Sequence, residues 1–255
     1  MRVWFYAMVS VLVVSAISLI GIFFLTFDRD RLRKLLFYLI SFAVGGLFGD
    51  AFIHLIPEAY RELGINPKTS LLIVFGILLF FILEKFIRWR HCHIPVSSTH
   101  LHPVVMMNLV GDGVHNLIDG VLIGASYMVD PTIGITTTIA VVLHEIPQEI
   151  GDFGVLLYGG LSVKKAVIYN LLSASCAFLG AIIALSVGVF SLDYLYYVLP
   201  VTAGGFIYIA GSDLIPELND ETANAHESCQ PSKAIGQLMA ISLGIGVMIL
   251  LTLLE

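Results

Sequence analysis

The chain has 255 residues, of which 58% are hydrophobic and only 13% charged, and its mean hydropathy is +0.93. A soluble domain carries about 25% charged residues, so this composition excludes an ordinary soluble protein and makes the lipid bilayer the expected partner. We expect no nucleic-acid partner. The net charge of −6 has little influence on how the chain sits in a membrane, because acidic residues contribute little to orientation.

Apolar runs long enough to span a membrane recur along the whole chain. A spanning helix needs roughly 20 residues to cross about 30 Å of hydrocarbon, and the short gaps leave no room for a separate soluble domain. We therefore predict an all-α integral membrane protein with a single transmembrane domain over residues 1–255. Its eight helices are expected at about 3–26, 34–60, 68–88, 103–128, 132–158, 163–190, 193–218 and 233–254.

The first two segments have alternatives. Arg2 precedes a long apolar run, as in a signal peptide, but that run exceeds the usual 7–15-residue core of such peptides. The second segment is interrupted by polar residues and a proline, namely Asp50, His54, Pro57 and Glu58.

Basic residues predict the orientation. Ten of the 13 Lys and Arg residues lie in or beside the loops after the first, third, fifth and seventh segments. The positive-inside rule places these loops in the cytoplasm and both termini outside, with the inner cell membrane as the expected location. Cys92 and Cys229 then lie in cytoplasmic loops and Cys176 inside a helix, so we expect no disulfide.

A short internal repeat relates the second and seventh segments. Residues 43–46 (Ala-Val-Gly-Gly) lead to 54–58 (His-Leu-Ile-Pro-Glu), and residues 202–205 (Thr-Ala-Gly-Gly) lead at the same offset to 213–217 (Asp-Leu-Ile-Pro-Glu). The two segments cross the bilayer in opposite directions, which indicates the inverted repeat of many transporters and a 3+2+3 arrangement of helices. The alternative is a coincidence between ordinary close-packing glycines.

The fourth and fifth segments carry ionisable side chains where a membrane helix should have almost none. Such groups cost several kcal/mol unless they are paired or used, so they mark a functional site. On the fourth segment, three of them fall within about 60° of one another on the helix: Asp112, His115 and Asp119. On the fifth, polar groups span an arc of about 140°: His144, Glu145, Gln148, Glu149 and Asp152. Pro147 should kink this helix and free the carbonyl of Leu143.

Two imidazoles with several carboxylates suit a borderline divalent ion such as Zn²⁺, Fe²⁺ or Mn²⁺. There are enough carboxylates for one to bridge two ions. Because the ligands bind in their deprotonated forms, loading should weaken in acid. The alternative is a hydrogen-bonded network that only locks the packing of the helices.

At these residues the chain resembles the ZIP (Zrt-, Irt-like protein) family of divalent-metal transporters. Residues 115–120 (His-Asn-Leu-Ile-Asp-Gly) resemble its fourth-helix signature, and residues 144–153 its fifth-helix signature, in the branch with a His-Glu-x-Pro-His-Glu motif. The resemblance implies a homodimer with a two-metal site between these helices. The metal positions that it implies are His115, Asn116, Asp119, His144, Glu145 and Glu149. Gln148 departs from the branch, and its amide oxygen is a weaker zinc ligand than imidazole, which leaves the second ion and the metal preference open.

Further polar residues suggest a route for the ion. Asp50, His54 and Glu58 recur every four residues along the second segment toward its outer end, and Asp213 and Glu217 share that spacing near the inner end of the seventh. We interpret them as outer and inner vestibules, although Glu58 and Glu217 could simply be solvated helix ends. The cytoplasmic loop 89–102 holds four His and a Cys, which suits either capture of released metal or a solvated loop.

The sequence thus predicts transport of divalent transition-metal ions toward the cytoplasm, with zinc as the main substrate and iron, manganese or cadmium as others. We expect no enzymatic activity and no cofactor, and no ATP-binding loop indicates a pump. The alternative is an intramembrane metal-dependent hydrolase with Glu145 as the base, but Gln148 and Pro147 depart from the motif of zinc proteases. The sequence does not separate a carrier from a channel.

Overall fold

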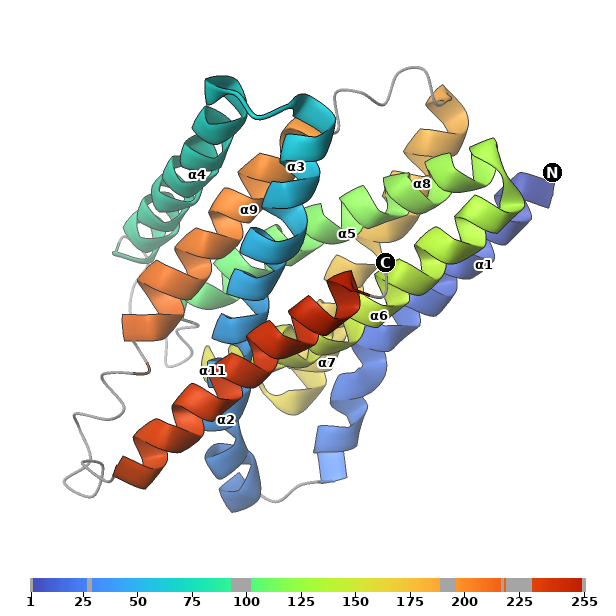
Figure 1. Cartoon of the computed structure of the whole chain (residues 1–255). Helices are drawn as coiled ribbons and strands as arrows, with labels where there is room; N and C mark the ends of the chain where they lie inside the picture. Colours follow the sequence, from blue (N-terminus) through green and yellow to red (C-terminus); the bar gives the residue numbers. More distant parts are fainter. Residues whose placement is uncertain are drawn as a thin grey trace.

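The structure, a computed structural model, describes residues 2–26, 29–92, 102–188, 196–216, 218 and 231–253. Apart from short turns and connections, the secondary structure of these residues is helical, without a strand, so the predicted all-α class is confirmed (Figure 1). Two predictions fall outside the described residues, namely the inner-vestibule role of Glu217 and most of the His-bearing loop, residues 93–101.

The described chain forms a series of α-helices, three of which continue into a 3₁₀ or π-helical segment. In chain order they are α1 (Arg2–Ile17) with the 3₁₀ segment η1 (Ser18–Thr26), α2 (Arg29–Gly49) with the π-helical η2 (Asp50–Leu55) and α3 (Ile56–Leu63), α4 (Pro67–Cys92), α5 (Pro103–Val129), α6 (Pro131–Tyr158), α7 (Val163–Ala174), α8 (Cys176–Val187), α9 (Val198–Tyr208) with the π-helical η5 (Ile209–Leu214), and α11 (Pro231–Thr252).

Five stretches of the described chain are long and apolar enough to cross a membrane, and they lie within residues 2–24, 35–63, 67–87, 163–187 and 233–252. The protein is therefore an integral membrane protein by length and composition. α5 and α6 have 27 and 28 residues but are not among the five, because the polar residues at their centres lower their apolar character. These two helices are also the ones that carry the predicted site.

Proline and a capping side chain fix where the two central helices meet. Pro103 and Pro131 occupy the first turns of α5 and α6, where the missing N–H costs no hydrogen bond. The backbone N–H of Thr132 donates to the Asp130 carboxylate at 2.7 Å, and this bond holds the pKa of that exposed carboxyl below its usual value. Only Asp130 separates α5 from α6, so the two helices are antiparallel neighbours.

The helices pack into two groups. In one group α1, α5, α6, α7 and α8 contact one another, and the α5–α8 contact is the most extensive in the described chain. In the other, α2 packs against α11 and α4 against α9 (Figure 1). The largest contact between the groups joins α2 to α6. The predicted site therefore lies beside a boundary between two bodies of helices.

Glycines bring α2 and α11 into direct backbone contact. A Cβ atom at Gly45 would collide with the backbone carbonyl of Ile241, and one at Gly244 would collide with the carbonyl of Phe42. Small residues at such crossings allow membrane helices to approach closely and gain van der Waals contact. On each helix the obstructing carbonyl belongs to the residue three positions before the glycine.

The α4–α9 crossing repeats this arrangement. A Cβ atom at Gly204 would collide with the carbonyl of Ile73, and one at Gly76 would collide with the carbonyl of Val201. Here too each carbonyl lies three residues before the glycine, and Gly204 occupies the same place in its Gly-Gly pair as Gly45. The sequence repeat of the second and seventh segments therefore has a counterpart in how those segments pack.

The two π-helical segments add a second correspondence. η2 and η5 each contain six residues and each is followed directly by Ile-Pro. Within them the N–H of Ile56 donates to Ala51, and the N–H of Ile215 donates to Ala210. A proline lacks the N–H for a regular α-helical bond and its ring crowds the carbonyl four residues earlier, so a wider turn accommodates Pro57 and Pro216. η2 presents Asp50 and His54, and η5 presents Asp213.

A glycine substitution tests the packing of α2 on α11. Gly45→Ala should destabilise the protein by about 1–3 kcal/mol, the usual cost of overpacking, because the neighbouring backbone of Ile241 cannot move as a side chain can. Gly46→Ala is the matched control, since a Cβ atom there would have no atom within 4 Å. Thermal melts of the purified protein in detergent measure the difference, and equal melting temperatures for the two variants would contradict the crossing.

Candidate metal centre

Four buried side chains from the two central helices converge on one point. His115 and Asp119 come from α5, and His144 and Glu145 come from α6. One ligand atom of each lies within 4.8 Å of the ligand atoms of the other three. All four side chains are at most 3% exposed. These are four of the seven residues that the sequence predicted as metal ligands, namely the six positions that the family resemblance implies and Gln148, and we call the four the central cluster.

Asp119 links the two histidines of the central cluster. Its Oδ2 atom lies 3.2 Å from Nε2 of His144 and 3.5 Å from Nε2 of His115. Nε2 of His115 also lies 3.9 Å from Oε1 of Glu145. Two imidazole nitrogens and two carboxylates facing one small volume form the donor set that borderline divalent ions prefer.

Unsatisfied polar atoms argue against a purely structural network. Both ring nitrogens of His115 and both carboxylate oxygens of Glu145 are buried without a hydrogen-bond partner. Buried polar groups in folded proteins are almost always hydrogen-bonded, because leaving one unpaired costs about 1–3 kcal/mol. A network that served only to lock the helices would satisfy its own members. Together with Asp119 and His144, these side chains form a group that could hold a metal ion.

The second segment reaches the central cluster through η2. The Asp50 carboxylate places Oδ1 3.0 Å from Nδ1 of His54 and Oδ2 3.8 Å from Nδ1 of His115. The ring centres of His54 and His144 are 5.0 Å apart. Asp50 and His54, which the sequence placed only in an outer vestibule, therefore adjoin the central cluster.

The other predicted ligands form a polar layer next to the central cluster. Asp112 accepts hydrogen bonds from the Asn116 amide at 2.8 Å and from the Ser173 hydroxyl of α7. Glu149 accepts one from the Asn170 amide of α7. Hydrogen bonds thus join Asn116 to Asp112 within α5, and they join Asp112 and Glu149 to α7.

Two contacts near the site were not predicted from the sequence. Asn108, one turn before Asp112 on α5, donates to the Asp152 carboxylate at 3.0 Å, and its place in line with Asp112 on the polar face of that helix was a signal that could have revealed it. The ring of Phe206 on α9 lies 5.5 Å from the ring of His115. Nothing in the local sequence distinguishes Phe206 from any other buried aromatic residue.

A cleft leads from one end of the helices to the central cluster. Its volume is about 580 Å³, and its lining includes Glu58, His54, Asp119 and His144. Glu58, which lines this cleft, pairs with Arg61. Two of the three predicted outer-vestibule residues, His54 and Glu58, thus line one continuous space with two members of the central cluster, whereas Asp50 is not part of that lining. Asp213 is buried on η5 and is not part of that lining or of the central cluster.

Comparisons with known proteins point in the same direction. A family model described as "ZIP Zinc transporter" matches residues 1–103 and 90–252. The human zinc transporter ZIP10 is 39% identical over 181 residues, which cover 66% of this chain and 22% of ZIP10. Zinc transporter zipt-7.1 of Caenorhabditis briggsae is 29% identical over all of this chain and 80% of its own length. The metal cation symporter ZIP14 of Xenopus tropicalis is 29% identical over 98% of this chain and 70% of its own length. The chain spans about a fifth of the ZIP10 proteins that it matches.

Zinc should stabilise the purified protein through the central cluster. A ligand at about 100 times its dissociation constant stabilises the folded state by about 2.7 kcal/mol, which raises the melting temperature of a chain of this size by about 5–10 °C. Melting curves of the detergent-solubilised protein with and without Zn²⁺ measure this shift. The double variant His115→Ala, His144→Ala should lose it. A network without metal would instead give no zinc shift in the wild type and a lower melting temperature in the variant under both conditions.

Proposed function

Since this chain belongs to the ZIP family, we propose that it transports divalent transition-metal ions across a membrane toward the cytoplasm, with zinc as the main substrate. Iron, manganese and cadmium are further candidates by the same donor chemistry. The observation that carries this proposal is the buried central cluster of His115, Asp119, His144 and Glu145 at the end of an open cleft. A metal site in a soluble protein would need no cleft of this kind through a largely hydrophobic molecule.

The proposed route begins in the cleft. An incoming cation meets the carboxylate of Glu58 at the outer helix end and then His54 and Asp50 on η2. From there it is within reach of His144 and His115. Each step exchanges one oxygen or nitrogen donor for the next, which keeps the ion coordinated while it loses water. On the inner side we assign Asp213, and Glu217 by its sequence position, to the exit.

The polar layer beside the central cluster supplies donors for a second ion. Asp112, Asn116 and Glu149 present oxygen atoms next to the two histidines, and Oδ1 of Asn116 and Oε1 of Glu149 have no hydrogen-bond partner. A two-metal site between α5 and α6 is therefore part of the proposal.

The proposed topology has eight membrane crossings in the 3+2+3 order, with both termini outside the cell membrane and a homodimer as the assembly. The paired glycine crossings and the paired π-helical segments support the inverted repeat that this topology contains. Transport is favoured over the hydrolase alternative, because Glu145 belongs to the donor cluster itself and the family is one of transporters.

Flux measurements test the site. His115→Ala, His144→Ala and Glu145→Gln should each lower zinc uptake into proteoliposomes by about tenfold or more. Loss of a residue that only holds a metal ligand in place already costs about that much, and loss of the ligand itself should cost no less. Ile139→Ala is the control, because that side chain is 54% exposed on the apolar face of α6 and should transport normally. Near-normal uptake of zinc, iron and manganese by all three site variants would reject the assignment. Saturable uptake by the wild type would indicate a carrier and linear uptake a channel.

Cysteine labelling tests the direction. In a variant without Cys92, Cys176 and Cys229, single cysteines at Asn66 and Asp130 should react with an impermeant reagent in intact cells. Cysteines near Lys34, His100 and Lys165 should react only after the membrane is permeabilised. The opposite pattern would invert the topology, and the cleft would then be an exit.

A further inference from the structure

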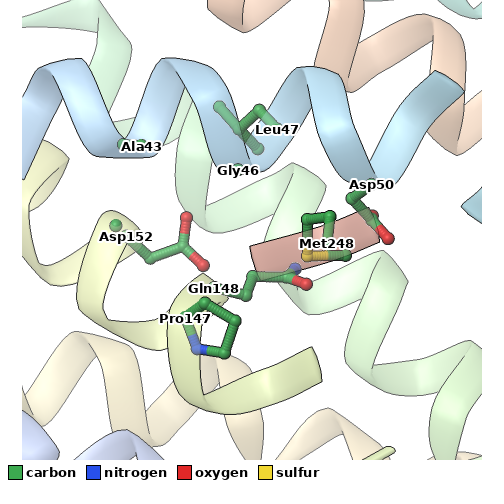
Figure 2. Close-up of a pocket in the computed structure, with 9 residues that line it drawn as sticks. Ala43, Gly46, Leu47, Asp50, Pro147, Gln148, Asp152 and Met248 are labelled. Atoms are coloured by element: carbon green, nitrogen blue, oxygen red, sulfur yellow. The ribbon is translucent and has the colours of Figure 1, made fainter. Parts of the chain in front are cut away.

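A second, smaller pocket lies between α2 and α6, on the side of Gln148 that faces away from the middle of α5 (Figure 2). Its polar lining consists of Asp50 from η2 and of Gln148 and Asp152 from α6. Figure 2 shows the amide of Gln148 between the carboxylates of Asp152 and Asp50. The rest of the lining is apolar or small: Ala43, Gly46, Leu47, Pro147, Gly151 and Met248.

The three polar side chains of this pocket hold unsatisfied atoms. Asp50, Gln148 and Asp152 are 2%, 8% and 3% exposed. Oδ2 of Asp50, Oδ2 of Asp152 and both amide atoms of Gln148 are buried without a hydrogen bond. The other carboxylate oxygens are held in place, since Asp50 Oδ1 contacts His54 and Asp152 Oδ1 accepts from Asn108. Each acid is thus anchored by one oxygen while the other makes no hydrogen bond, and in Asp50 this second oxygen, Oδ2, lies 3.8 Å from Nδ1 of His115.

The size of the pocket suits a small occupant. Its volume is about 10 Å³, near the lower limit of about 10–15 Å³ that holds one water molecule. A hydrated divalent ion does not fit, whereas an ion that has exchanged its water for protein oxygens does. Beyond the pocket, toward the start of α2, the two helices close against each other, because Gly151 abuts Ala43 and Gly154 abuts Leu39.

Asp50 connects this pocket to the central cluster. One of its oxygens lies 3.8 Å from His115, and the same residue lines the pocket. In the proposed topology α6 runs inward from Pro131, so Asp152 lies about two turns deeper than Glu145. The pocket is therefore the next polar space on the way from the central cluster toward the cytoplasm.

We propose that Asp50, Gln148 and Asp152 form a separate cation-binding site. Their side chains offer oxygen donors, and the site receives the ion from the central cluster. This inference rests on the proposed transport function. Carboxylate and amide oxygens without imidazole favour a harder ion such as Mn²⁺ over Zn²⁺. Three protein oxygens form an incomplete shell for such an ion, and a site on a transport route must bind weakly enough for the ion to leave.

Gln148 determines which donor atoms this proposed site offers, and therefore which metal ion it prefers. Replacing it by His would add an imidazole and convert the oxygen-only donor set into a mixed one, which suits Zn²⁺ better. Gln148→His should therefore raise the affinity of the pocket for Zn²⁺ relative to Mn²⁺ by about tenfold or more.

Mn²⁺ titrations of the full-length purified protein, followed by electron paramagnetic resonance, test the proposal. The double histidine variant His115→Ala, His144→Ala is made in an Asp112→Asn, Glu149→Gln background, which also removes the carboxylates proposed for the second ion, and it should retain one weak class of Mn²⁺ site. Adding either Asp152→Asn or Gln148→Leu to that variant should abolish the remaining site. Adding Met248→Leu, which changes only an apolar lining residue, should leave it intact.

Folding is checked separately by the zinc-dependent thermal shift. Asp152→Asn and Gln148→Leu in the wild-type background should keep this shift, because the central cluster is unchanged. The proposal is overturned if the double histidine variant binds no Mn²⁺, which would mean that the pocket holds only water. It is also overturned if Mn²⁺ binding survives both pocket substitutions. Either result leaves the proposed function intact, since that function fails only if the wild-type protein moves no metal.

Discussion

The arrangement of this molecule depends on the cost of burying ionisable groups in an apolar interior. His115, Asp119, His144 and Glu145 are almost completely excluded from solvent, and the ring nitrogens of His115 and the carboxylate oxygens of Glu145 make no hydrogen bond. In such surroundings an unpaired charge costs several kcal/mol. This cost is the reason for our proposal that a divalent cation binds here, and the surrounding helices must hold the donor side chains together at that cost when no cation is bound.

Close helix packing makes that possible. The crossing at Gly45 and Gly244 brings the backbones of α2 and α11 together, and Gly151 and Gly154 allow α2 to lie directly on α6. With a side chain at these positions α2 would stand farther from α6. Asp50 would then no longer reach both the central cluster and the pocket beside Gln148. Glycines at the helix crossings, which have no donor atoms in a side chain, thus decide which donor side chains can meet.

The donors change in character along the molecule. The imidazoles of His54 and His144 line the cleft, whereas the polar lining of the pocket between α2 and α6 consists of two carboxylates and an amide beside the thioether of Met248. On the route that we propose, softer donors followed by harder ones would give successive sites with different preferences. The boundary between the two groups of helices passes through α2 and α6, so any relative movement of the groups would alter the pocket first.

The sequence by itself determined the all-α class, the membership of the ZIP family and which two segments carry the clustered ionisable side chains. Hydrophobic run length and the spacing of His115 and Asp119 are local properties, and local geometry fixes which residues share a helix face. Tertiary structure alone decided which neighbour each face meets. Glu149 turns to α7 and Gln148 to α2, although both lie within one turn of Glu145. Helix periodicity gives the direction of a side chain from its own axis, but the partner across the interface depends on how distant segments pack.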